Sequence, residues 1–189
     1  MEKERKKYYF STFDLILMAI IAAIGGVING AFMFSFIQPF KVFFPFLGDL
    51  AGIPLTGLYV LWLVITRLLI RKTGAATLCG LIQGIIEWQF GNPFGPLAIL
   101  FAGVEGFLID VVFVFFKERF TLFCSLIGGG LAILFADAIF FYVRKMTSPY
   151  ELLVGGIVAI ISGIILAGLL GWIVVRALYN TGIIKERHP

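Results

Sequence analysis

The sequence predicts an all-α integral membrane protein folded as a bundle of six transmembrane helices. Of its 189 residues, 60% are hydrophobic and only 14% are charged, whereas a soluble domain averages about 45–50% apolar and about 25% charged residues. The charges gather in short segments between long apolar runs, and these runs lack the alternation of a membrane barrel. The composition therefore excludes a soluble enzyme, a nucleic-acid-binding domain and a disordered chain.

The first three helices are bounded by basic, glycine-rich or proline-rich segments. Residues 1–10 are too polar to span a membrane, and the apolar run that follows predicts a retained helix over about 14–35. A phenylalanine-rich loop with two prolines separates it from a helix over about 50–71, which ends at Arg-Lys-Thr-Gly. The third helix covers about 75–90 and stops at Gly-Asn-Pro-Phe-Gly-Pro.

The last three helices end at charged or proline-containing turns. They are expected over about 97–116, 122–143 and 152–178, separated by Lys-Glu-Arg and by a short Ser-Pro loop. At about 20 residues per span, residues 1–189 then form a single transmembrane domain. No internal repeat is evident, which disfavours an inverted-repeat transporter.

The distribution of basic residues predicts the orientation of the bundle. With both termini in the cytoplasm, that side holds twelve of the 15 Lys and Arg residues, and the other side holds only Lys41, Arg144 and Lys145. This asymmetry follows the positive-inside rule. It explains the net charge of +4 without a nucleic-acid partner.

Three acidic residues have a structural interpretation. Asp14 and Asp49 lie at the starts of predicted helices, where a carboxylate caps free N–H groups and meets the positive end of the helix dipole. Asp110 lies towards the cytoplasmic side, where it either pairs with Arg67 or caps a neighbouring helix.

Three other acids, Glu87, Glu105 and Asp137, converge towards the outer half of the predicted bundle. An ionisable side chain at mid-bilayer costs about 2.5–3.5 kcal/mol on insertion scales, and no Lys or Arg is predicted at that depth. We interpret these acids as a binding site, with an interhelical hydrogen-bond network as the alternative. Neighbouring polar and aromatic residues complete the candidate substrate-binding set: Gln83, Trp88, Asn92, Gln38 and Tyr142.

The sequence lacks the motifs of several kinds of catalytic or metal site. The single histidine, His188, lies in the polar tail, and no Gly-rich phosphate-binding loop is present. We therefore expect no catalytic residue, no metal site, no cofactor and no ATP hydrolysis in this chain.

Small residues recur at a spacing of four in the first helix. Ala19 with Ala23, and Gly26 with Gly30, predict a smooth surface for close packing of another helix.

Together with the predicted architecture, three segments resemble a known family: GxxNGAFMF, GLIQGIIEWQFGNPFGP and AGVEGFLID. The chain resembles the S component of an energy-coupling factor (ECF) transporter, and most closely the YkoE-type members related to thiamin and hydroxymethylpyrimidine. The resemblance implies a substrate-capturing subunit of an ATP-driven vitamin importer in the prokaryotic plasma membrane. It also implies a binding site near the extracellular side, a coupling subunit that packs on Ala19 and Ala23, and two cytoplasmic ATPases.

The acids are compatible with thiamin, since a carboxylate balances the thiazolium cation and accepts hydrogen bonds from the aminopyrimidine. Two other functions stay open at this point. The same acids suit a self-sufficient proton-coupled carrier for a cationic solute. They also suit an accessory subunit in which they only join the helices.

Overall fold

The structure is a computed structural model that describes residues 9–33, 35, 39, 42–43, 52–92, 94–116, 121–143 and 149–182. Gln38 and Asp49, a candidate binding residue and an expected cap, lie outside these ranges, as does the side chain of Tyr142.

Every regular element in the described ranges is helical, as the composition predicts. The elements are α1 (Thr12–Val27), η1 (Ile28–Met33), α3 (Gly57–Ile70), α4 (Ala75–Gln89), α5 (Leu97–Phe115), α6 (Thr121–Val143), α7 (Pro149–Ser162), η3 (Gly163–Leu169) and α8 (Leu170–Asn180). Most boundaries lie within a few residues of those expected. The main differences are the π-helical turns η1 and η3, which lie inside the first and last expected helices.

Five described helical segments are long and apolar enough to cross a membrane. They are Thr12–Ala31, Gly52–Ile70, Leu97–Phe115, Thr121–Ile139 and Leu153–Asn180. The remaining helix, α4, has 15 residues, fewer than the about 20 that a perpendicular span needs. Length alone therefore supports five of the six expected spans.

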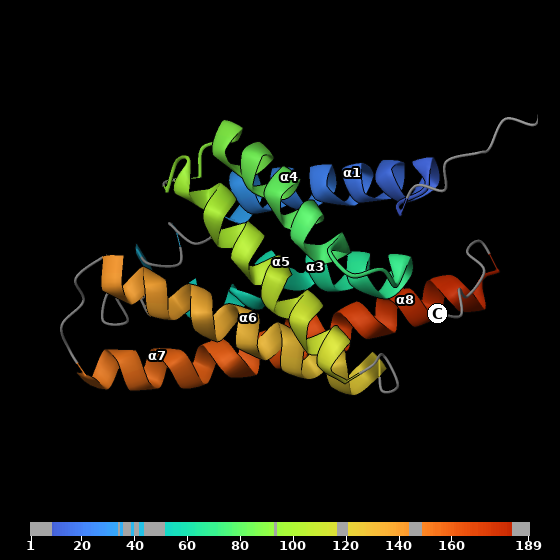
Figure 1. The fold of residues 1–189 in the computed structure, drawn as a ribbon. Coiled ribbons are helices and arrows are strands. Elements are labelled where there is room, and N and C mark those ends of the chain that lie inside the picture. The colour runs from blue at the N-terminus through green and yellow to red at the C-terminus, as the bar shows by residue number, and fades with distance from the viewer. Residues whose placement is uncertain are drawn as a thin grey trace, which may run out of the picture.

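Helix α3 is the centre of the bundle. Its side chains are buried almost continuously from Val60 to Ile70, and it contacts α1, α4, α5, α6, η3 and α8. Figure 1 shows the pair α4 and α5 lying across α3, with α1 on one side and α6, α7 and α8 on the other. This arrangement lets α3 bury apolar side chains on all of its faces.

Glycines bring α4 and α5 into close contact. A Cβ on Gly80 would collide with the carbonyl oxygen of Ala102, and one on Gly106 would collide with that of Ala76. The two helices are thus antiparallel and nearly in backbone contact. The neighbour that approaches Gly80 is therefore the backbone of α5.

The small residues of α1 form two separate faces. Gly26 and Gly30 are buried, and a Cβ on either would meet Ile86 or Phe90 of the α4 segment. Ala19 and Ala23 are exposed on another face. Of these two pairs, only the glycines are therefore used for packing within the bundle.

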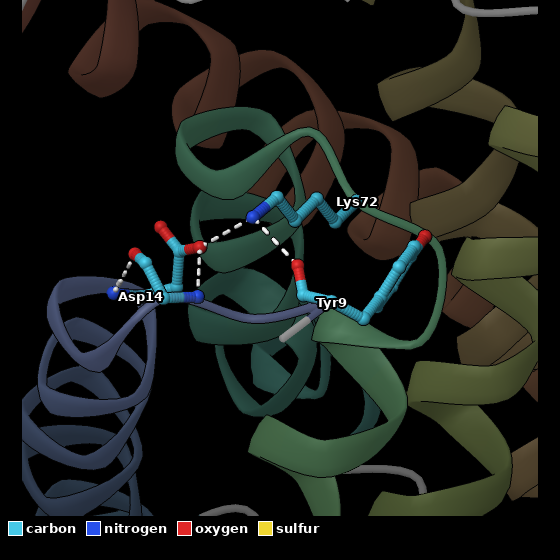
Figure 2. Close-up of polar contacts among 4 residues, drawn as sticks. Tyr9, Asp14 and Lys72 are labelled. Atoms are coloured by element: carbon cyan, nitrogen blue, oxygen red, sulfur yellow. Dashed lines mark hydrogen bonds and ion pairs between the residues drawn. The ribbon is translucent and has the colours of Figure 1, made fainter. Parts of the chain in front are cut away.

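The start of α1 is attached to the turn between α3 and α4, as Figure 2 shows. Asp14 and Ser11 form a reciprocal capping box, which confirms the predicted cap. Lys72 Nζ lies 2.7 Å from Asp14 Oδ2 and donates to the Tyr9 carbonyl oxygen at 2.8 Å. Asp14 thereby joins two segments that are 58 residues apart.

Candidate binding site

Glu87 is held in a buried network of amide donors from three segments. Oε1 accepts hydrogen bonds of 2.9 Å from Asn29 Nδ2 in η1 and from Gln83 Nε2 in α4. Oε2 accepts a bond of 3.0 Å from Asn92 Nδ2 in the turn after α4. We call Asn29, Gln83, Glu87 and Asn92 the Glu87 network. The Glu87 carboxylate, which has no ion-pair partner among the described residues, is thus surrounded by N–H donors.

The same amides fasten the network to α3. Asn29 Nδ2 and Gln83 Nε2 each donate a second hydrogen bond, of 3.1 Å, to the backbone carbonyl oxygen of Tyr59. Both hydrogens of each amide group are therefore used. Asn92 is fixed differently, because its Oδ1 accepts a bond of 3.0 Å from Phe94 N.

Glu105 and Asp137 differ sharply from Glu87. Both are buried, with 7% and 8% of their surface exposed, yet neither forms an ion pair with another described residue. Within the described part of the chain, Asp137 Oδ2 also has no hydrogen-bond partner. Glu87 and Asp137 lie close enough to Glu105 for their carboxylates, when ionised, to repel it. These two carboxyl groups are therefore an uncompensated acidic pair.

Helix register explains how the acids come together. Gly84 of α4 lies against Ile99 of α5, and Gly128 of α6 lies against Ile109. Because neighbouring helices are antiparallel, Asp137 of α6 lies beside about residue 100 of α5. Glu87 of α4 lies slightly nearer the start of α5. Glu105 is then about 7.5 Å deeper along α5, at 1.5 Å per residue.

Tyr59 and Asn29 are not among the residues that the sequence predicts for the site. The Tyr59 side chain, on α3, lies within electrostatic range of Glu87 and Glu105. Asn29 carried a signal that could have been used, because a lone amide in an apolar helix needs a partner. No comparable signal marked Tyr59, whose contacts depend on packing between helices.

Other candidate residues divide between the network and the surface. Gln83 and Asn92 belong to the Glu87 network, whereas Trp88 is 42% exposed on α4. No group of three or more His, Cys, Asp or Glu residues that could hold a metal ion occurs among the described residues.

Asp110 is neutralised within the protein. Its Oδ1 lies 3.0 Å from Arg67 Nε, and its Oδ2 accepts bonds from Thr77 N and Thr77 Oγ1 at 2.9 and 2.7 Å. Both suggested roles of Asp110, pairing with Arg67 and capping a neighbouring helix, are thus confirmed. Arg67 is fully buried and lies 5.0 Å from the Phe113 ring centroid, so it is not a charge of a cytoplasmic loop.

Three comparisons relate the chain to known proteins. Residues 13–135 match the family described as the ABC-type cobalt transport system, permease component. YkoE of Bacillus subtilis (strain 168), by its name a candidate HMP/thiamine permease, is 29% identical over 176 residues, which cover 91% of this chain and 86% of that protein. A crystal structure of an S-component of an ECF transporter superimposes with a TM-score of 0.82 and 28% identity, covering 92% of this chain and 88% of the other.

Proposed function

We propose that this chain, which belongs to the permease-component family of ABC-type cobalt transport systems and is an ECF-type S component, captures thiamin or a related pyrimidine. Its relatives are transport proteins rather than enzymes. With its apolar spans, the chain is a multi-pass protein of the prokaryotic plasma membrane. The site that we propose lies near the extracellular side.

The observation that carries this proposal is the acidic pair. Glu105 and Asp137 are buried with like charges as neighbours and without a described cation. A permanent cation such as a thiazolium ring would balance this charge, and it would gain from the low dielectric of the site. The name of the YkoE relative, which refers to HMP and thiamine, supports the same ligand class.

The residues of the proposed site have separate roles. Glu105 and Asp137 bind the cationic part of the ligand, and Tyr59 offers an aromatic face beside them. Gln83 and Asn92 hold Glu87 in place. Gln38 and Tyr142 stay candidates for ligand contact, and the exposed Trp88 is left out of the site.

We also propose a single domain with six spans and cytoplasmic termini. The support is the path of α4, which packs antiparallel along α5 from Gly84 to Ala76. Helix α4 must return the chain across the membrane if α3 and α5 run in the same direction. A locally thinned bilayer accommodates its 15 residues.

The remaining parts of the proposed importer are partner subunits. The exposed residues Ala19 and Ala23 suit close packing of a helix from a transmembrane coupling subunit. ATP would be hydrolysed by two cytoplasmic ATPases, with no cofactor in this chain. Ala19→Leu and Ala23→Leu should abolish assembly with the coupling subunit and leave ligand binding unchanged. Unchanged assembly would contradict this role.

Calorimetry of the purified full chain against a panel of water-soluble vitamins tests the ligand. We expect tight binding of thiamin or its pyrimidine precursor, weakened by Glu105→Gln in protein that remains folded. Folded protein that binds no member of the panel would refute the ligand assignment. Uptake by vesicles that contain this chain alone, driven by a pH gradient, would favour a proton-coupled carrier instead.

A further inference from the structure

The orientation of the Asn29 side chain is dictated by its neighbours. Its two amide hydrogens point at two acceptors, Glu87 Oε1 and the Tyr59 carbonyl oxygen. Exchanging the amide oxygen and nitrogen would place the oxygen against these acceptors, which are a carboxylate and a carbonyl. The amide oxygen of Asn29 must therefore face away from both.

The amide oxygen of Asn29 is a buried acceptor to which no described residue donates a hydrogen bond. Asn29 is fully buried, and Oδ1 has no hydrogen-bond partner among the described residues. Buried acceptors are normally satisfied by protein, water or ligand. Asn29 also lies in η1, a π-helical turn, and such turns are frequent at functional sites.

The amide oxygen of Gln83 is a weaker candidate, although it too lacks a donor among the described residues. It lies against Gly25 and the Trp62 indole, where a Cβ on Gly25 would already be crowded. Packing between α1, α3 and α4 therefore occupies its surroundings. Asn29 is left as the buried acceptor that lies next to Glu87, itself an acidic neighbour of Glu105.

We infer that Asn29 is a ligand-contacting residue whose side-chain oxygen accepts an N–H donor of the bound molecule. The inference rests on the proposed function and deepens it, because it selects among heterocycles. An amino-substituted pyrimidine presents the N–H that Asn29 requires. An analogue with an oxo group at that position presents a second acceptor, and the fixed amide cannot turn to accommodate it.

Asn92 provides a matched control within the same network. Like Asn29, it donates one hydrogen bond to the Glu87 carboxylate, at 3.0 Å. Unlike Asn29, its oxygen already accepts the Phe94 N–H. Substitution of either residue removes a donor to Glu87, but only substitution of Asn29 removes an unpaired acceptor.

The test measures the affinity of the detergent-purified full chain for thiamin and for oxythiamin, in which oxygen replaces the amino group of the pyrimidine. We expect wild-type protein to prefer thiamin by about tenfold or more, the scale of one hydrogen bond. Asn29→Leu should reduce this preference to about onefold to threefold, whereas Asn92→Leu should weaken both ligands by the same factor. Asn29→Ala is measured in parallel, so that the preference can still be determined if Asn29→Leu does not fold.

Each outcome decides between the proposals. Equal affinity of wild-type protein for the two compounds would overturn the role of Asn29 and leave the proposed function standing. The role of Asn29 would also be overturned if Asn29→Leu and Asn92→Leu changed the preference for thiamin over oxythiamin by the same factor. Failure of wild-type protein to bind thiamin, oxythiamin and hydroxymethylpyrimidine would instead refute the proposed function itself.

Discussion

Asp110 and Glu105 lie five residues apart on α5, yet their surroundings are opposite in charge. Asp110 has Arg67 at 3.0 Å and two donor groups of Thr77. Glu105 has the like charges of Glu87 and Asp137 as neighbours. The first arrangement removes the cost of burying a carboxylate, and the second leaves that cost to be offset by something that binds.

Glu87 represents a third arrangement. Its two oxygens are satisfied by three amide groups, and no described Lys or Arg forms an ion pair with it. The three environments show that an acid in an apolar helix acquires its role from the groups that other helices bring to it. The following substitutions test that division, beginning with the residue whose loss should be most damaging.

Substitution of Arg67 should be the most destabilising change. Arg67→Met leaves Asp110 buried without its cation, and breaking a buried ion pair costs about 3–5 kcal/mol. Thermal unfolding of the detergent-solubilised protein measures the loss. Arg176→Met is the control, because Arg176 is exposed and its guanidinium lies over the Trp172 ring, 4.8 Å from the ring centroid.

The double variant Arg67→Met/Asp110→Leu removes both charges and should recover much of the stability lost with Arg67 alone. A wild-type unfolding temperature for Arg67→Met would contradict the structural role of the pair.

Glu87→Gln should destabilise the protein by about 2 kcal/mol. One carboxylate oxygen becomes an amide nitrogen that faces N–H donors, so at least one charge-assisted hydrogen bond is lost. The free energy of unfolding in denaturant checks this value. Gln89→Ala, on the exposed face of the same helix, should be nearly neutral. If Glu87→Gln were as stable as wild type but no longer bound thiamin, Glu87 would belong with the binding acids.

Glu105→Gln should separate binding from stability. The substitution keeps the shape of the side chain and removes a charge that its neighbours oppose, so we expect unchanged or higher stability. Thiamin affinity should fall by about 10–100-fold, or about 1.4–2.7 kcal/mol. Asp110→Asn is the crossed control and should lower stability more than affinity. If Glu105→Gln lowered the stability of the protein and left its thiamin affinity unchanged, Glu105 would be a structural acid instead.

Of the four main substitutions, Lys72→Met should cause the smallest measured change, which is a slight loss of stability. Lys72 pairs with Asp14, but its side chain is 31% exposed, and partly exposed pairs contribute about 0.5–1 kcal/mol. The shift should shrink further as salt is added, because salt screens an accessible pair. Thr73→Ala, at the exposed neighbouring position, should not shift the transition. A large salt-independent loss would mean that this contact is structurally more important than its exposure suggests.

The parts of the molecule that sequence reasoning predicted depend on local or compositional rules. The helices follow from apolar runs and turn residues, and the capping role of Asp14 follows from its place at a helix start. The pairing of Asp110 with Arg67 was one of two alternatives, because charge complementarity limits the partners of a buried acid. The structure shows that both alternatives hold together.

The parts that were missed depend on which helix faces which. Asn29 and Tyr59 are 30 residues apart in the chain but meet through a side-chain to backbone bond. The stripe of α1 looked continuous in the sequence, yet its glycines face α4 and its alanines face outwards. Spacing along one helix cannot tell which of its faces a neighbour will cover.

By itself, the sequence determined that the chain enters a membrane as helices, because lipid offers no partner to an unpaired backbone and the apolar runs are long. It also determined that a few acids require an explanation, since their desolvation is costly. Only the tertiary structure decided which explanation applies to which acid. The free energy of a buried charge depends on groups within a few ångströms, and here those groups come from other helices.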